Sequence, residues 1–295
     1  MSGPSDRKRS RGRVVVSIVI AVLAIAYLGV LIWFRANENA LLFHPDRGPL
    51  LPASESLGLD SRDVAFSSAD GTSLVARMIP PPDGVLKDVA PWILYFHGSS
   101  GNVGTPGYNK AWARFRRMGL GVLAVDYRGF GRSAGAPSEA GIYQDAQAAY
   151  LYLTHDLAVA PNRIVIYGYS MGSAVAVDLA TRVPAAGLIV EGALLSVPTR
   201  GAELYPFLPV RWLARNRFAS EEKIARVSMA KLIIHARADE VVPIAHGRRL
   251  FELAGAPKTF KEVAGGHTDA YEVDPEFFAT VARFVRGLGL RVSSL

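Results

Sequence analysis

Ser170 lies in a sequence pattern that suits a nucleophile. The segment 168–172, Gly-Tyr-Ser-Met-Gly, follows the apolar run 163–167 and precedes a helical stretch that begins near Ala174. A sharp turn from strand to helix needs small flanking residues and holds its serine in a strained conformation. Such a turn lifts the hydroxyl above the sheet edge. The pattern therefore predicts that Ser170 is a nucleophile, with an ordinary tight turn as the alternative.

A serine hydroxyl needs a base, and one of the six histidines is well placed to be that base. His267 follows Gly265-Gly266 just after a predicted strand ending at Val263, in a loop at the C-terminal end of that strand. His97 also ends a strand, but it precedes the serine and is expected to shape a loop. The remaining histidines occupy connector, helix or strand positions that favour a structural or exposed role: His44, His155, His235 and His246.

The base in turn needs a carboxylate that orients its ring, and Asp239 is the predicted one. Asp239 follows the predicted strand 232–235 and can reach the ring of His267. Glu240, the next residue, is the alternative acid. Asp269 lies two residues beyond the histidine and is expected to form hydrogen bonds within its own loop.

Two backbone amides are predicted to stabilise the oxyanion that forms when the serine attacks. The amide of Met171 lies at the N-terminus of the helix after the serine, where the helix dipole adds to its effect. The second amide is expected in the loop after the predicted strand 92–96, where small residues let the backbone approach a substrate carbonyl. We assign it to Ser99, with Ser100 as the alternative.

The sequence contains no pattern for a metal or a cofactor. It has no cysteine, which excludes disulfides, thiolate zinc sites, iron–sulfur clusters and a cysteine nucleophile. It also lacks the His-Glu-x-x-His motif, a calcium loop and a phosphate-binding loop. The pair Gly129 and Gly131 is predicted to form a tight turn beside the active site, because no ribose-binding acid accompanies it. We therefore predict no cofactor and no bound metal.

The elements that position these residues alternate between strands and helices. Alternation with continuous apolar strands favours a parallel sheet covered on both faces. The first two strands lack an intervening helix and are expected to start the sheet antiparallel. The fold class is therefore α/β, with a mostly parallel eight-stranded sheet. Strands are predicted near 63–67, 73–79, 92–96, 121–126, 163–168, 187–191, 231–236 and 258–263, and helices near 108–118, 141–156, 171–183, 243–254 and 275–288.

A short lid is predicted around residues 192–229, and its middle is aromatic and apolar. The stretches 205–209 and 212–213 could form a hydrophobic wall for an acyl chain or simply pack onto the sheet, and the sequence leaves both open. Three arginines are expected on a solvated helix face, with contact to anionic lipid headgroups as the alternative: Arg211, Arg215 and Arg217.

Residues 14–34 are predicted to form one transmembrane helix. These 21 residues carry no formal charge, and as a helix they would be about 31 Å long, enough to cross a hydrocarbon core. Trp33 and Phe34 close the segment where an interfacial aromatic belt would lie. The alternative is a cleaved signal peptide, since residues 24–26, Ala-Ile-Ala, resemble a cleavage site. Seven further apolar residues after that point favour an uncleaved anchor.

The charge is concentrated before this helix. The chain has a formal charge of +7, of which residues 1–13 carry +4. The positive-inside rule then predicts a cytoplasmic N-terminus, with the rest of the chain on the opposite side, periplasmic in a bacterium. The weak remaining charge predicts no nucleic-acid partner. We expect a connector at 35–60, with residues 41–43 docking onto a domain at 61–295.

Five motifs together resemble the α/β-hydrolase family, and within it the membrane-anchored branch typified by alpha/beta-hydrolase-domain protein 13. They are HGSSGN at 97–102, DYRGFGRS at 126–133, GYSMG at 168–172, RADEVVP at 237–243 and GGHTD at 265–269, and the likeness covers roughly residues 40–289. The resemblance implies that fold and a Ser170, Asp239 and His267 triad. Two positions depart from the branch: Ser99 stands where asparagine is usual, and Ser173 where many relatives have glycine.

The resemblance also implies an activity. Members of the family are serine hydrolases of esters, thioesters or lipids, and some relatives cleave peptides. We therefore predict a membrane-anchored serine hydrolase that acts on a small-molecule or lipid acyl substrate through an acyl-enzyme. The alternatives are an aminopeptidase-like serine peptidase and a non-catalytic binding protein with a hydrolase fold. The oligomeric state is not predicted.

Overall fold

The computed structural model describes residues 4–48, 50, 60–85 and 89–293, with side chains from residue 12 onward. Its central sheet has eight strands in the order β10-β9-β8-β7-β4-β6-β3-β2. β3 pairs antiparallel with β2 and β6, and the other neighbours are parallel, which confirms the predicted sheet. The strands are β2 (Arg62–Ser67), β3 (Ser73–Ile79), β4 (Trp92–Phe96), β6 (Gly121–Asp126), β7 (Ile164–Tyr169), β8 (Gly187–Glu191), β9 (Ala230–Ala236) and β10 (Lys258–Val263).

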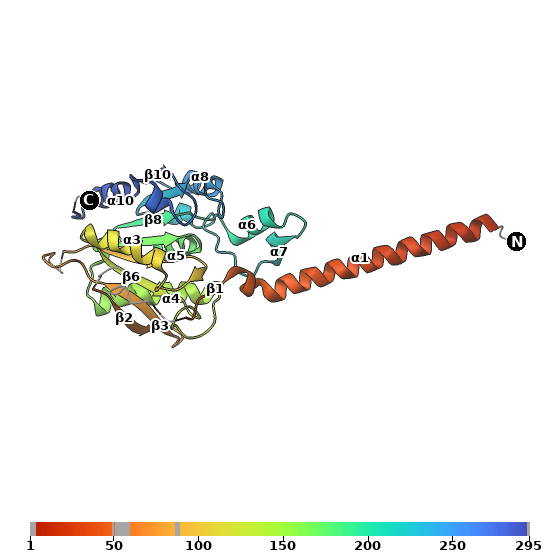
Figure 1. Ribbon diagram of the computed structural model, residues 1–295, viewed down its shortest axis with the longest axis horizontal. Helices are drawn as coiled ribbons and strands as arrows, with labels where there is room; N and C mark the ends of the chain where they lie inside the picture. Colours follow the sequence, from red (N-terminus) through yellow and green to blue (C-terminus); the bar gives the residue numbers. More distant parts are fainter. Residues whose placement is uncertain (1–3, 49, 51–59, 86–88, 294–295) are drawn as a thin grey trace.

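Helices cover both faces of this sheet (Figure 1). Alternate residues of each strand join two separate cores, so Leu94 and Ile166 pack under α4, α5 and α8, whereas Tyr95 and Tyr167 pack under α3 and α10. Burial on both faces explains the continuous apolar strands. The helices are α3 (Pro106–Arg117), α4 (Glu139–Leu151), α5 (Met171–Ala180), α6 (Val197–Leu204), α7 (Val210–Leu213), α8 (Ile244–Leu253), α9 (Ala270–Val273) and α10 (Phe277–Gly287), with shorter helical turns η1 (Tyr152–Asp156), η2 (Pro161–Arg163) and η3 (Ile224–Arg226).

The N-terminal helix α1 (Pro4–Leu42) projects far from the rest of the molecule (Figure 1). Its part from Gly12 to Leu42 is long and apolar enough to cross a membrane. The helix continues eight residues beyond the predicted span. The prediction of a connector was therefore wrong for residues 35–42, which contain neither glycine nor proline and so allow the helix to continue. Residues 49 and 51–59 of the predicted connector lie outside the described part of the chain.

Directly after α1, the chain docks onto the domain that contains the eight-stranded sheet. Phe43 is buried and makes edge-to-face contacts with Phe130 and Phe218, which confirms part of the predicted docking, whereas Leu41 remains 39% exposed. The next two residues form β1 (His44–Pro45), which pairs in parallel with β5 (Ser100–Gly101). This small second sheet ties the end of the N-terminal helix to the loop that follows β4.

Helices α6 and α7, in the predicted lid, lie beside the base of α1 (Figure 1). We call residues 192–229 the cap. The hydroxyl of Tyr27 donates a hydrogen bond to the carbonyl of Phe207 over 2.8 Å. The carboxylate of Glu38 accepts hydrogen bonds from the amides of Arg215 and Asn216 at 2.9 and 2.7 Å. Part of the apolar middle of the cap packs on α1, where Leu208 and Val210 form a buried cluster with Phe34, an arrangement that neither sequence interpretation considered.

Candidate active site

Ser170 lies at the sharp turn between β7 and α5. Its backbone φ is +53°, a left-handed conformation that non-glycine residues seldom adopt. The turn leaves no room for side chains on its neighbours: a Cβ at Gly168 would lie 2.3 Å from the carbonyl oxygen of Gly172, and one at Gly172 would lie 2.1 Å from that of Phe96. The sequence pattern thus reflects a steric requirement, and the turn presents Ser170 at the C-terminal edge of the sheet.

The structure brings together the three residues that the sequence proposed as nucleophile, base and acid. The Oγ of Ser170 lies 2.9 Å from the Nε2 of His267, and the Nδ1 of His267 lies 2.7 Å from a carboxylate oxygen of Asp239. An ionised carboxylate can only accept a hydrogen bond, so Nδ1 carries the proton and Nε2 is free to accept one from the serine hydroxyl. This arrangement can move a proton from the hydroxyl to the ring.

Asp239 is held ionised by its surroundings. Burial raises the pKa of this carboxyl, but hydrogen bonds from His235, His267 and the Val242 amide outweigh burial and bring the pKa well below its usual value. The second carboxylate oxygen accepts hydrogen bonds from the amides of Val241 and Val242, at 3.0 and 2.7 Å. The sequence analysis missed the role of His235, whose Nε2 lies 2.7 Å from the carbonyl oxygen of Val242 and 3.3 Å from the Asp239 carboxylate. His235 lies near the end of β9, four residues before Asp239, and this position could have indicated the contact.

The alternative acids contact the backbone of the histidine loop and not the imidazole ring. The carboxylate of Glu240 accepts a hydrogen bond from the His267 amide at 3.2 Å. That of Asp269 accepts one from the Gly266 amide at 2.6 Å. Both residues therefore shape the loop that carries His267, while Asp239 alone of these three carboxylates reaches its ring.

The loop after β4 passes directly beside the serine. A Cβ at Gly98 would lie 3.4 Å from the Cβ of Ser170, so the backbone at Gly98 and Ser99 can approach the reacting centre. Met171 is the first residue of α5, which places its amide at the helix N-terminus. The two amides predicted as oxyanion donors thus belong to segments on either side of Ser170.

The buried side chain of His97 supports the loop after β4. The His97 ring is fully buried, with Nδ1 2.8 Å from the carbonyl of Gly98 and Nε2 3.5 Å from the carboxylate of Asp126. Asp126 also accepts a hydrogen bond from the Val103 amide at 2.8 Å. His97 therefore connects the loop after β4 to the end of β6, in line with the expectation that it shapes a loop.

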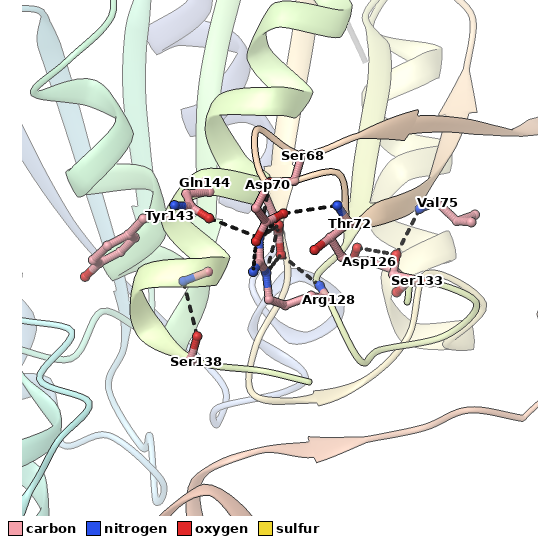
Figure 2. Close-up of polar contacts among 12 residues, drawn as sticks. Ser68, Asp70, Thr72, Val75, Asp126, Arg128, Ser133, Ser138, Tyr143 and Gln144 are labelled. Carbon is pink, nitrogen blue, oxygen red and sulfur yellow. Dashed lines mark hydrogen bonds and ion pairs between the residues drawn. The ribbon is translucent and has the colours of Figure 1, made fainter. Parts of the chain in front are cut away.

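The turn that follows β6 is anchored by Arg128 (Figure 2). Its guanidinium donates hydrogen bonds to Asp70 at 2.8 Å, to Ser68 at 3.2 Å and to the buried carboxylate of Asp145 at 2.7 Å. These contacts join the turn to the β2–β3 hairpin and to α4. Gly129 and Gly131 lie in turns with positive φ of 81° and 49°, which confirms the predicted tight turn, whereas the contacts of Arg128 were not predicted.

A cavity of about 350 Å³ opens beside Ser170. It lies between the loop after β4, α3 and the segment that follows His267, and none of the described cap residues 192–229 lines it. The sequence analysis missed most of its lining, including Glu191 at the end of β8. A charged residue that ends an apolar strand next to the nucleophile's strand was the signal that could have identified it. Among the described residues, no group of three histidine, aspartate or glutamate side chains could hold a metal ion.

Comparisons with known proteins agree with this architecture. The sequence model of the serine aminopeptidase S33 family matches residues 88–220. The chain is 34% identical over 257 residues to the uncharacterized protein Rv2307c of Mycobacterium tuberculosis, covering 87% of this chain and 89% of that one. It is 33% identical to the uncharacterized protein YfhR of Escherichia coli K12, covering 72% and 75% of the two chains.

A solved structure shows the same fold. The esterase Pf2001 of Pyrococcus furiosus superposes with a TM-score of 0.67, covering 83% of this chain and 98% of the esterase at 19% identity. At that identity the likeness concerns the fold, whereas the two bacterial sequences above are close enough to define a family. The chain therefore belongs to the α/β-hydrolase superfamily, in one family with these two bacterial relatives.

Proposed function

We propose that this protein is a membrane-anchored serine hydrolase that cleaves ester or thioester bonds of acyl substrates. The observation that carries the proposal is the hydrogen-bonded series from Ser170 through His267 to Asp239, with distances of 2.9 and 2.7 Å. A serine becomes nucleophilic when an oriented imidazole can take its proton. The cavity beside the serine provides space for the substrate.

The proposed reaction proceeds in two halves. The Oγ of Ser170 attacks the substrate carbonyl carbon as its proton passes to the Nε2 of His267, and the amides of Ser99 and Met171 stabilise the oxyanion. The tetrahedral intermediate expels the alcohol or thiol, which takes the proton from His267. Water then attacks the acyl-enzyme, His267 accepts the water's proton and returns it to Ser170, and the carboxylic acid leaves. Throughout, Asp239 orients the ring and stabilises the imidazolium.

The membrane part of the proposal rests on α1 and its charge asymmetry. The basic residues precede the apolar segment, which favours a cytoplasmic N-terminus and a catalytic domain on the opposite side of the membrane. The helix has the length and composition of a membrane span. A retained anchor is favoured because seven further apolar residues follow the possible cleavage site at 24–26 before Arg35.

Exposed apolar side chains of the cap also support a location at the membrane. Phe207 and Trp212 are 68% and 88% exposed, which is unusual for large apolar side chains. Phe207 is bonded to Tyr27, which lies seven residues, or about 10 Å, before Phe34 along the helix. If residues 14–34 span the bilayer, this part of the cap dips into the apolar layer beside the helix, and the cavity opens near the membrane surface.

An aminopeptidase-like serine peptidase is the second candidate, because the matching family model is that of a serine aminopeptidase. A fluorophosphonate probe tests the shared chemistry, since labelling requires an activated serine. We expect the full-length protein in detergent to be labelled and the S170A variant to remain unlabelled. Hydrolysis of matched ester, thioester and aminoacyl-amide substrates then separates an esterase from a peptidase. A folded wild-type protein that resists the probe would favour a non-catalytic binding protein.

A further inference from the structure

The cavity beside Ser170 contains a carboxyl group that the proposed reaction does not use. Glu191 ends β8, the neighbour of the strand that carries the nucleophile, and is only 7% exposed. Its backbone carbonyl accepts a hydrogen bond from the Ser170 amide at 2.9 Å. The next residue, Gly192, lies so close to the His267 ring that an added Cβ would be 3.2 Å from its Cε1. Glu191 thus adjoins the reacting groups.

One oxygen of the Glu191 carboxyl has no hydrogen-bond partner among the residues that the structure describes. The other oxygen accepts a hydrogen bond from the hydroxyl of Tyr167 at 2.6 Å. The first oxygen is not fully buried, and Glu191 belongs to the cavity lining, so this oxygen is accessible from the cavity. A carboxylate oxygen that is open to a cavity and has no partner among the described residues is available to a ligand.

The Glu191 carboxyl has no lysine or arginine side chain near it in the cavity, because none of the described residues that line the cavity is a lysine or an arginine. Burial raises the pKa of Glu191 to about 7, although the Tyr167 hydrogen bond and the nearby His267 and His235 lower it, and Asp239 raises it. A ligand that brings a positive charge would favour the ionised form and would pair with it in a site of low polarity.

The rest of the lining suits the same kind of ligand. Tyr95 and Tyr167 stack with ring centroids 5.1 Å apart, and Tyr108 and Tyr169 meet edge to face at 5.9 Å. Aromatic faces attract ammonium groups, most strongly where water is excluded. The aromatic residues of the lining are Tyr95, Tyr108, Tyr167, Tyr169, Tyr271 and Phe277.

We propose that Glu191 and this tyrosine wall form a subsite for an ammonium group carried by the substrate, so that the enzyme prefers cationic esters over neutral ones of the same shape. The proposal rests on the proposed serine hydrolase function and adds a substrate class to it. The ammonium group binds in the cavity against the Glu191 carboxylate while the ester carbonyl lies at Ser170. The positive charge could belong to the acyl chain or to the alcohol, and the test distinguishes the two.

The test compares pairs of esters that differ only in the charge. The acyl pair is p-nitrophenyl 6-aminohexanoate and p-nitrophenyl heptanoate, and the alcohol pair is butyrylcholine and 3,3-dimethylbutyl butyrate. We expect the full-length protein in detergent to show a kcat/KM about tenfold or more higher for the cationic member of one pair. The pair that shows the preference identifies the half of the substrate that enters the subsite.

The variant E191Q keeps the shape of the side chain and removes its charge. E191Q should reduce the cationic-to-neutral ratio of kcat/KM at least tenfold, while kcat/KM for the neutral ester should change much less. If Glu191 had only a structural role, E191Q would lower kcat/KM for both esters together and leave their ratio unchanged. The matched control is E262Q, because Glu262 lies on the outer strand β10 and pairs with Arg237 and Arg248 at the surface.

A second variant tests the carboxyl group without removing it. Y167F deletes the hydroxyl that donates to Glu191, and this loss should raise the pKa of Glu191 further. The preference for the cationic ester should therefore shift to higher pH in Y167F. An unshifted pH dependence, or an unchanged substrate ratio in E191Q, would overturn the inference.

The failure of this inference can be distinguished from a failure of the proposed function. Fluorophosphonate labelling and hydrolysis of the neutral esters report on the serine alone. A labelled enzyme that hydrolyses neutral esters and shows no Glu191-dependent preference in either pair would keep the serine hydrolase and overturn the ammonium subsite. Absent labelling and absent hydrolysis would overturn both.

Discussion

The amide of His44 donates a hydrogen bond to the carbonyl of Ser99 over 2.8 Å. His44 lies two residues after the end of α1, and Ser99 lies in the loop that is proposed to bind the oxyanion. The first residues outside the helix thus form part of the structure that holds the active-site loop. The same pairing continues from Asp46 to Gly101 at 3.1 Å.

Removal of the His44 donor should weaken catalysis. The H44P variant lacks the backbone N–H, so the oxyanion loop loses one of its ties, and we expect kcat to fall roughly tenfold to a hundredfold because misplacing one donor has effects of that order. H44A keeps the N–H and should retain nearly full activity, since the His44 side chain is exposed. Ester turnover at saturating substrate measures both. Equal activity of the two variants would show that this contact does not position the loop.

Loss of the nucleophile should abolish turnover and leave the fold intact. S170A removes the hydroxyl that lies 2.9 Å from Nε2 of the His267 ring, and any residual rate should be at most ~10³–10⁴ over the uncatalysed reaction. S173A is the matched control, because its buried hydroxyl lies one turn away and has no hydrogen-bond partner among the described residues. Circular dichroism checks folding. Near-normal turnover in S170A would contradict the assignment.

The two adjacent acids should respond differently to substitution. D239N should reduce kcat by up to ~10⁴, because an amide at that position stabilises the wrong tautomer of His267. E240Q should have a much smaller effect, since Glu240 contacts only the backbone amide of His267. The same ester assay ranks them. The reverse order of effects would assign the orienting role to Glu240.

Glu191 should make the protein less stable as the pH rises. Its pKa is raised from 4.5 to about 7 in the folded state, so between these values the native protein binds more protons than the unfolded chain, and stability declines as pH increases. From pH 5 to pH 8 the contribution amounts to about 2 kcal/mol.

The E191Q variant isolates this contribution. Its free energy of unfolding relative to the wild type should increase by about that amount over the same interval, as measured by urea denaturation of the full-length protein in detergent at each pH. E262Q should show no such trend, because the pKa of Glu262 is lowered and this group titrates below the interval. A constant difference between E191Q and the wild type would mean that Glu191 does not titrate there.

Trp212 should enter the apolar layer of a bilayer. In liposomes that contain brominated lipids, tryptophan fluorescence of the full-length protein should be quenched more than that of W212F, because bromine quenches the indole at close range. The difference between the two proteins reports on Trp212 itself and corrects for the other three tryptophans. Equal quenching in both would place this face of the cap in water.

Much of the fold and the candidate site follows from local sequence. Burial on both faces makes the inner strands continuously apolar, and the turn at Ser170 requires glycine on both sides, so both features can be identified in a single sequence. The order of Ser170, Asp239 and His267 and their places at strand ends could also be predicted, because each residue follows a recognisable apolar strand. Parallel strands carry their C-terminal ends to one edge of the sheet, so residues there converge even when far apart in the chain.

The tertiary structure decided which of these residues make contact. Only the loop geometry determines that Asp239 reaches the ring of His267 and that Glu240 reaches its backbone. Glu191 meets Tyr167 because β7 and β8 are neighbours with their odd-numbered residues on one face, and strand order is not a property of any local segment. The packing of the cap on α1 joins residues about 180 positions apart. Such contacts depend on how whole elements pack, which no short stretch of sequence encodes.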